Sequence, residues 1–417
     1  MLFPGAKRMK RKLLCLTVLL ALAVHGAYAR GIFDNEAGFQ WELSEDGGSV
    51  VITGYTGTNT DIWIPPRIQD LPVTGIGDYA FSEEGLGYGF VQASRQFTSV
   101  VIPGTVQRIG RGAFHGGLLS AVTIPQSVTY IGWAAFCSNR LTSVTIANAP
   151  AHLADWAFCC NRLVRLNLGN SITHIGAGAF ADSLLKSVLI PDSVVFIGEE
   201  AFAGNRLTSV TIGAGVIEIG EDAFAENRLE SVTIPDSVIV IGAGAFWDNR
   251  LTSVTIGASV IEIREDAFAE NRLESVTIPD SVTFIGDEAF AGNRLESVVI
   301  GSSVTHIGDD AFAENRLESV TIPDSVRYIG EGAFAVNLME SIVIGSGVTH
   351  IGYEAFAYNH PLASVSIGGN VAISRSGLSR YSDLFGTSFA EFYESHGRRA
   401  GTHTHSGGVW SAEFRYE

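Results

Sequence analysis

One stretch, AFAENRLESVTIPDSV, occurs three times in this chain without change, at Ala223–Val238, Ala267–Val282 and Ala311–Val326. An Ala-Phe pair recurs with a constant 22-residue period, with Phe at positions 114, 136, 158, 180, 202, 224, 246, 268, 290, 312, 334 and 356. A fixed period of this size is the signature of a solenoid, in which each coil buries its apolar face only against its neighbours. The period therefore predicts one long array with caps, not two or three ordinary domains.

Each coil contains one short apolar alternation and one turn. Leu251–Ile256, with the sequence LTSVTI, alternates as a strand with one buried face does. Val260–Ile263 and Ala267–Phe268 follow, and we expect them to close the coil through a turn or about one helical turn. Stacked strands would form a parallel sheet along one side, about 4.8 Å apart. The predicted fold is an α/β solenoid, right-handed, with about a dozen 22-residue coils.

The repeat resembles the BspA-like, or Treponema pallidum-type, leucine-rich repeat. The pattern SVTIPDSVxxIGxxAFxxN occurs at Ser187–Asn205 (beginning SVLI), Ser231–Asn249 and Ser319–Asn337, and the resemblance runs from Phe97 to Ile373. It implies a bacterial surface protein, because BspA-like relatives are associated with attachment to extracellular-matrix proteins, with coaggregation and with host receptors. A leucine-rich repeat array over 81–373 is the corresponding expectation.

The amino end is typical of a secretory signal. Five Lys or Arg residues precede the apolar run Leu13–Val24, and Ala27-Tyr28-Ala29 fits a small-x-small cleavage site, which predicts a signal peptide over 1–29. The alternative, a transmembrane anchor, needs a longer apolar run. We expect an exported protein without a transmembrane segment after cleavage, located in the periplasm, at the cell surface or outside the cell.

The charge balance excludes some partners. The net charge of −17 becomes −22 when the five cations of the leader are removed. An acidic chain repels nucleic acid and anionic membrane surfaces, so neither is expected to bind.

Both ends of the array differ from the repeat. Residues 30–80 predict a β-rich N-terminal cap and first turn, with strands at Phe39–Leu43 and Val50–Thr53. An insertion around Gly85–Gly89 predicts a loop that bulges from the array. Residues 374–417 predict a β-rich C-terminal cap that packs aromatic side chains on the last coil. They resemble the end of treponemal members of the family.

Stacking converts each repeat position into a row. An Asn row, from Asn139 to Asn359 with Ser183 as its exception, predicts hydrogen bonds to turn backbone and between neighbours in the row. An Arg row needs acids nearby to limit repulsion, so we expect a solvated, charge-paired edge; the alternative is a site for an anionic glycan or peptide. The residue after the strand alternates between Pro and Gly from Pro191 to Gly345, which indicates duplication of a 44-residue unit of two coils.

The outward side of the predicted sheet is a hydroxyl-rich strip with an acidic flank. Such a surface suits many weak contacts with an extended or repetitive partner. The predicted ligand-binding residues are Ser231, Thr233, Ser253, Thr255, Glu274, Ser275, Thr277, Glu318, Ser319 and Thr321.

Histidines and cysteines offer weaker candidates for chemistry. His152, His174, His306 and His350 share one repeat position, and His403 and His405 would share a strand face, but neither set has enough ligands to predict a metal site. Cys137 and Cys159 occupy equivalent places in neighbouring coils, within disulfide range, and Cys160 is the third mature cysteine. A Cys137–Cys159 bridge, buried free thiols and redox chemistry all remain open.

Repetition itself argues against catalysis. An active site needs groups in an environment unlike the rest of the surface, whereas these coils present the same side chains several times. We therefore expect no enzyme activity and no cofactor. The sequence predicts a monomeric adhesin-like protein that binds an extracellular protein or glycan through its open face. The alternatives are a periplasmic scaffold without a specific host ligand and a glycan-binding or carbohydrate-active solenoid.

Overall fold

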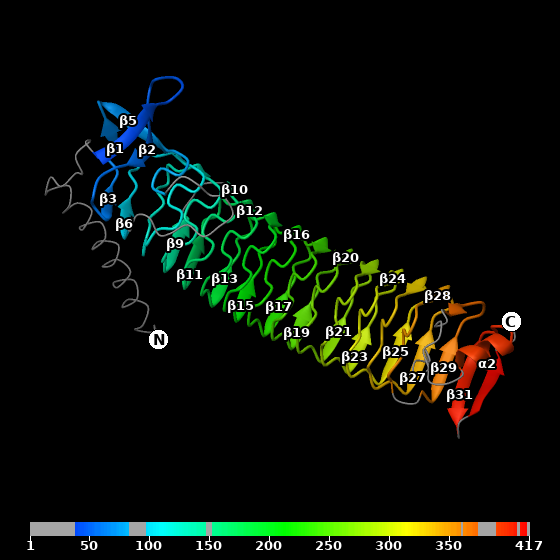
Figure 1. Cartoon of the computed structure of the whole chain (residues 1–417). Coiled ribbons are helices and arrows are strands. Elements are labelled where there is room, and N and C mark those ends of the chain that lie inside the picture. The colour runs from blue at the N-terminus through cyan, green and yellow to red at the C-terminus, as the bar shows by residue number, and fades with distance from the viewer. Residues whose placement is uncertain are drawn as a thin grey trace, which may run out of the picture.

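The structure, a computed structural model, describes residues 38–82, 97–146, 152–359, 362–373, 389–406 and 409–414. The predicted signal peptide and the Gly85–Gly89 loop lie outside these residues. The described chain is an elongated solenoid with a cap at each end (Figure 1). Equivalent residues of successive coils lie side by side, so that Ser231 pairs with Ser253 in the next coil. The predicted solenoid is confirmed.

One long side of the solenoid carries the longer strands of each coil, which we call the front strands. They are β6 (Ser99–Val101), β9 (Ser143–Ile146), β11 (Arg165–Leu168), β13 (Ser187–Leu189), β15 (Ser209–Thr211), β17 (Ser231–Thr233), β19 (Ser253–Thr255), β21 (Ser275–Thr277), β23 (Ser297–Val299), β25 (Ser319–Ile322), β27 (Ser341–Ile344) and β29 (Ser364–Ile367).

The opposite long side carries short strands, which we call the rear strands (Figure 1). They are β7 (Arg108–Ile109), β8 (Tyr130–Ile131), β10 (His152–Leu153), β12 (His174–Ile175), β14 (Phe196–Ile197), β16 (Glu218–Ile219), β18 (Val240–Ile241), β20 (Glu262–Ile263), β22 (Phe284–Ile285), β24 (His306–Ile307), β26 (Tyr328–Ile329), β28 (His350–Ile351) and β30 (Ala372–Ile373).

The continuous parallel ladder runs along the rear strands, from β7 to β30. The front strands pair only in groups, as β9–β11, β13–β15, β17–β19, β21–β23 and β25–β27–β29. The sequence predicted one sheet on the front side and did not predict the rear ladder. In the described array the coil closes through turns and not through a helix, so the helical part of the predicted class is confined to α2 (Phe389–Ser395).

The alternation of Pro and Gly explains the grouping of the front strands. Gly345 donates its N–H to the Ile322 carbonyl oxygen of the coil before, at 2.9 Å. Pro323 holds the same position one coil earlier and has no N–H to donate to Ile300. In the three pairs before it, the bond at this end of the strands runs the other way, and Ile234 of the Pro coil donates its N–H to the Thr255 carbonyl oxygen at 2.8 Å. The ladder is interrupted before the Pro coils and formed before the Gly coils. The 44-residue unit inferred from the sequence is a hydrogen-bonded pair of coils.

The core is a column of phenylalanine rings. Thirteen rings, one per coil from Phe81 to Phe356, stack with centroids 4.9–5.8 Å apart and interplanar angles up to 17°. All are at most 4% exposed. Burying each such side chain contributes about 1.5–3 kcal/mol, so the column stabilises every coil boundary.

The buried Asn row satisfies the backbone of the turns, as predicted. Asn271 Nδ2 donates to the carbonyl oxygens of Phe246, Phe268 and Ala269, and its Oδ1 accepts from Leu251 N at 2.9 Å. Each Asn thereby joins its own turn to the coil before. The predicted bonds between neighbouring Asn side chains are not seen among the described residues.

The N-terminal cap is a β-rich unit whose first strands lie where predicted. β1 (Phe39–Leu43) and β2 (Val50–Tyr55) form an antiparallel hairpin. β4 (Arg67–Ile68) pairs antiparallel with β5 (Leu71–Ile76), and β2 pairs parallel with β5, which leads into the rear ladder. β3 (Asp61–Trp63) pairs with β6, so the front side also begins in the cap.

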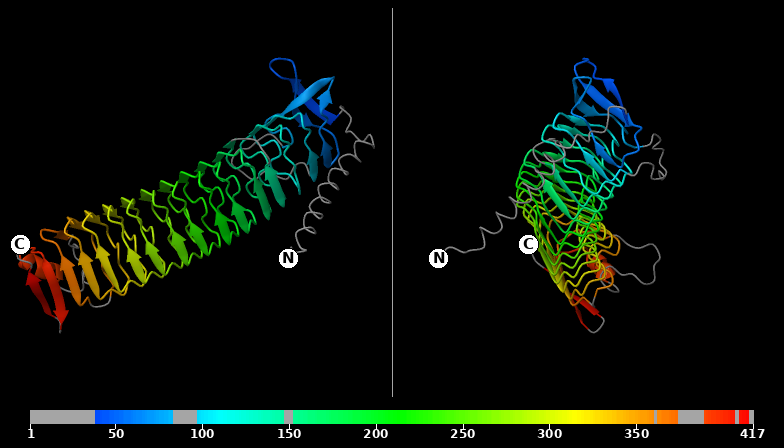
Figure 2. Two further views of the ribbon diagram at one scale, coloured as in Figure 1. Left: turned by 180° about the vertical axis from the view of Figure 1, so that it is seen from behind. Right: turned by 90° about the vertical axis from the view of Figure 1, so that its left-hand side faces the viewer.

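The C-terminal cap combines α2 with two strands, β31 (Gly401–Ser406) and β32 (Val409–Phe414). β31 runs antiparallel to β29 and so reverses the direction of the front strands at the last coil. The caps lie at opposite ends of the solenoid (Figure 2). Phe389 and Tyr393 are fully buried, and the Tyr393 hydroxyl donates to the Gly368 carbonyl oxygen at 2.6 Å, as expected for aromatic packing on the last coil.

The helix in this cap was not predicted. Phe389, Phe392 and Tyr393 are spaced i, i+3 and i+4, which places all three rings on one face of a helix. His403 of β31 packs edge-on against these rings and is 0% exposed. It is therefore a core residue of the cap and not half of an exposed His pair.

Candidate binding surface

The predicted binding residues are exposed on the front strands or directly before them. They lie on β17, β19, β21 and β25, and the whole set is Ser231, Thr233, Ser253, Thr255, Glu274, Ser275, Thr277, Glu318, Ser319 and Thr321. Alternation along each strand places the Ser and Thr side chains outward and the intervening Val inward. We call this outward side of the front strands the open face.

The pairing of coils sets the pattern of hydroxyl groups on the open face. Within a pair the register is in step, with Ser231 beside Ser253 and Thr233 beside Thr255. The next pair begins at Ser275 and repeats the same register. In that pair Ser275 lies beside Ser297, whereas Thr277 lies beside Val299, so the Ser row repeats with each pair of coils and the Thr row does not.

Apolar side chains interrupt the Thr row, and the sequence analysis did not single them out. Leu189, Val299 and Val343 occupy the Thr position and are 65%, 59% and 46% exposed. Their place in the strand alternation is the signal that could have identified them. The open face is thus amphipathic, and it offers apolar contact area beside hydroxyl groups.

The Arg row beside the front strands is exposed, at Arg140, 162, 206, 228, 250, 272, 294 and 316. The predicted charge pairing of this edge is not found. In the described part of the chain, the two ion pairs within 4 Å are Arg264–Glu262 and Arg398–Glu394, and neither involves the row. Hydration and ionic screening suffice for exposed charges that are not in contact.

A row of acidic residues lies in the turn that precedes the core phenylalanines. Burial, and then the charge of neighbouring carboxylates, raises the pKa of Asp222, Glu288 and Asp310, and raises that of Asp266 to about 6. The carboxylates lie close to others in the adjacent coils, so each makes ionisation of the next less favourable. This turn is the strongly anionic edge of the solenoid.

The histidines that share a repeat position begin four of the rear strands. The rings of His152 and His174 stack with centroids 4.2 Å apart. Burial and then the charge of His152 lower the pKa of His174. In the part of the chain that the structure describes, no third ligand group joins this pair closely enough for a metal site.

Residues 74–206, 195–317 and 261–384 match the family described as BspA type leucine rich repeat region. Together these segments run from 74 to 384, more than half of the 417 residues. The chain belongs to the BspA-type leucine-rich repeat family.

Solved structures of bacterial leucine-rich repeat proteins are similar to this BspA-type chain. A leucine-rich repeat protein from Bacteroides ovatus is 22% identical, with a TM-score of 0.52, over 81% of this chain and 88% of that chain, and shares its fold. A leucine-rich cell surface protein from Faecalibacterium prausnitzii is 24% identical, with a TM-score of 0.44, over 82% and 98%. The pneumococcal vaccine antigen PcpA is 16% identical, with a TM-score of 0.42, over 84% and 89%. No curated protein matches this BspA-type chain.

In the ranges that the structure describes, no helix combines the length and the apolar character needed to cross a bilayer.

Proposed function

We propose that this BspA-type protein is exported, is monomeric, and binds an extracellular protein through its open face. The observation that carries the proposal is the exposed Ser row, which repeats in register on the front strands beside a Thr row with apolar replacements. A repeated surface gains strength by making many weak contacts at once, provided that the partner is long or repetitive.

The amphipathic character of the open face favours a protein ligand over a purely polar one. Exposed Leu189, Val299 and Val343 supply apolar area, whereas the hydroxyl groups supply hydrogen bonds. Protein interfaces combine both kinds of contact. The export and surface location rest on the predicted signal peptide and on the resemblance to BspA-like proteins.

The test is binding of the secreted protein to an immobilised panel of extracellular-matrix proteins and glycans. Thr233→Lys, Thr277→Lys and Thr321→Lys, combined in one chain, place three bulky cations on the open face. A matched control places the same three charges beside the rear strands, as Val195→Lys, Ile217→Lys and Ile261→Lys, at side chains 36–48% exposed. Saturable binding lost only in the front variant supports the proposal.

If both variants lose binding equally, or if neither variant loses binding, the open face is not the binding surface. Protease treatment of intact cells tests location separately. Protection of a folded protein that binds nothing on the panel would favour the periplasmic scaffold.

A further inference from the structure

The position after each core phenylalanine changes character in one part of the array. It is Ala at 181, 203, 225, 269, 291, 313, 335 and 357, Trp at 247 and Ser at 82. In three successive coils it is instead His115, Cys137 and Cys159, and Cys160 follows directly. His and Cys are the side chains that bind borderline and soft metal ions. Three successive coils therefore carry metal-ligand groups at a position that is alanine in most of the array.

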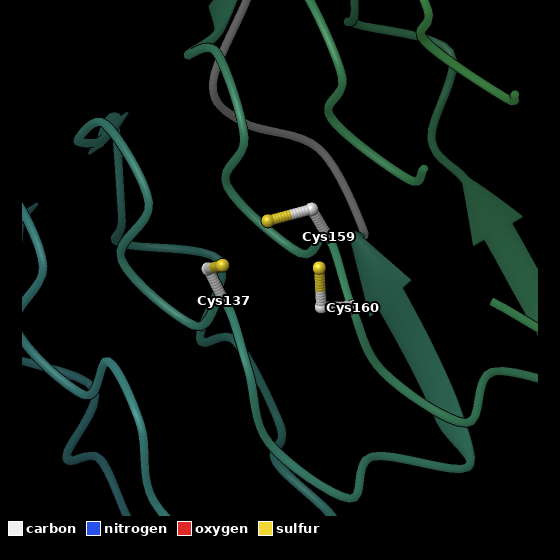
Figure 3. A group of neighbouring side chains, drawn as sticks. All are labelled: Cys137, Cys159 and Cys160. Atoms are coloured by element: carbon white, nitrogen blue, oxygen red, sulfur yellow. The ribbon is translucent and has the colours of Figure 1, made fainter. Parts of the chain in front are cut away.

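The three sulfur atoms converge. Figure 3 shows the side chains of Cys137, Cys159 and Cys160 pointing toward a common centre, and their Sγ atoms all lie within 4.8 Å of one another. Among the residues that the structure describes, these form the one group of three or more His, Cys, Asp or Glu ligands so close together. Cys137 and Cys159 are buried, whereas Cys160 is exposed and gives access from solvent.

The backbone holds this arrangement in place. Ser138 donates its N–H to the Cys159 carbonyl oxygen at 3.1 Å, which fixes the two turns side by side. Cys160 adopts the left-handed conformation, with φ of 52°. A turn of this kind does not send successive side chains to opposite faces as a strand does, so Cys159 and Cys160 can face the same centre.

A metal ion accounts for all three cysteines, whereas a disulfide does not. Equivalent residues in stacked coils are separated by about 4.8 Å, which lies within the Cα spacing of a disulfide, so the spacing alone permits a Cys137–Cys159 bridge. Such a bridge would leave Cys160 unpaired, because three thiols cannot all pair within one chain. Tetrahedral ligands at the Zn–S distance of about 2.3 Å lie roughly 3.8 Å from each other, which small side-chain rotations reach from the observed separations. The structure has all three cysteines as free thiols, so of the alternatives that the sequence left open the Cys137–Cys159 bridge is not formed.

We propose that Cys137, Cys159 and Cys160 bind one thiophilic d10 metal ion as thiolates, a site distinct from the open face. Binding releases the three thiol protons to solvent and leaves the fourth position to water or to His115 of the preceding coil. Asp182 borders the site, with its Oδ2 3.8 Å from Cys160 Sγ. The ion would join two successive turns of the array.

Zinc is the probe for this proposal. The full chain, carrying Cys15→Ser so that only these three thiols remain, is reduced, freed of metal and titrated with zinc against a chromophoric chelator. We expect one zinc ion per chain, and an affinity lower by at least about 10-fold in Cys160→Ser. Because Cys160 is exposed, this variant keeps the core intact, which circular dichroism verifies. His174→Ala disrupts the stacked His152–His174 pair, which lies outside the cysteine cluster. It serves as the control, and no change in zinc affinity is expected.

Cadmium gives a second readout, because thiolate ligands produce a charge-transfer absorption that His and carboxylate ligands lack. Absence of this band, zinc binding unchanged in Cys160→Ser, or no zinc binding by the folded reduced chain would each overturn the proposal. Secreted protein denatured without reductant should show three reactive thiols. A single reactive thiol would mean that a disulfide occupies the cluster instead, and the metal site would be rejected.

Discussion

Asn205 donates from its Nδ2 to the Phe180 carbonyl oxygen of the preceding coil at 2.9 Å. The same bond recurs along the Asn row, but in the coil between Asn161 and Asn205 the row holds Ser183. The Ser183 hydroxyl is buried without a partner among the described residues. Its shorter side chain cannot make the contacts that Asn makes to Leu N–H and Phe C=O groups in the neighbouring coils.

Ser183→Asn should therefore stabilise the array, by about 1–2 kcal/mol, by supplying an acceptor for Leu163 N–H and a donor for Phe158 and Phe180. Asn271→Ala should have the opposite effect and cost about 2–5 kcal/mol, since it leaves several buried backbone groups without a partner. Urea midpoints and amide hydrogen exchange of the adjacent coils measure both. A destabilising Ser183→Asn would mean that the irregular coils cannot accommodate the larger side chain.

Gly345→Ala should destabilise the pair of coils that begins at β25. A Cβ at this position would lie 2.6 Å from the carbonyl carbon and oxygen of Pro323, which are backbone atoms and cannot rotate away. Strain of this kind costs about 1–3 kcal/mol. Gly104→Ala is the matched control, because a Cβ there meets nothing within 4 Å. Equal thermal midpoints for the two variants would show that the two neighbouring coils can move apart to admit the added methyl group, and would contradict the prediction.

The anionic turn should make stability fall as pH rises. The pKa of Asp266 is raised from 3.8 in the unfolded chain to about 6 in the fold, so the folded state binds more protons between these values. The contribution of Asp266 to the stability of the folded state is favourable below about pH 4 and is lost as pH rises through about 6. Asp266→Asn should stabilise the protein at neutral pH and flatten the pH profile between those limits.

Denaturant unfolding across this range provides the measurement. Glu274→Gln, on the exposed flank of the open face, is the control, with no flattening expected. Asn also tolerates the left-handed backbone at position 266, so a gain independent of pH would be conformational and would not support the electrostatic explanation.

His403 should make the C-terminal cap sensitive to acid. Burial among aromatic rings lowers its pKa from 6.5, which the backbone of Arg399 partly opposes. The unfolded state therefore takes up the proton first, and the cap loses stability as pH falls below about 6.5. Hydrogen exchange of the β31 amides should accelerate on acidification, and His403→Phe should remove most of this change, whereas His405→Gln should not. An unaltered acid response in His403→Phe would assign the sensitivity to another group.

The sequence predicted the coil, its period and the buried rows, because a 22-residue repeat fixes which positions face the core. It did not reveal the rear ladder, since strands as short as Phe284–Ile285 cannot show an alternation. The alternation of Pro235 and Gly257 was visible, but its effect on strand pairing depends on how closely the backbones approach.

The turns were also only partly predictable. Glycine is the residue that adopts a positive φ most readily, yet Asp222 and Glu226 adopt positive φ of 49° and 53°. These polar residues tolerate the conformational cost because tertiary contacts along the stack hold the turn. For the candidate surface, the sequence identified outward hydroxyl groups but not the convergence of Cys137, Cys159 and Cys160, which needs the direction of each side chain.

The pairing of Pro and Gly coils also governs how such a molecule can change in length. Removal of a single coil from the regular array would bring two Gly coils or two Pro coils together. Removal or insertion of a whole pair would instead leave each Pro coil next to a Gly coil, with the same spacing between their backbones. Each inserted pair would carry the cap roughly 10 Å farther along the axis. The reach of the array is therefore adjustable in steps of two coils, while the chemistry of its open face stays the same.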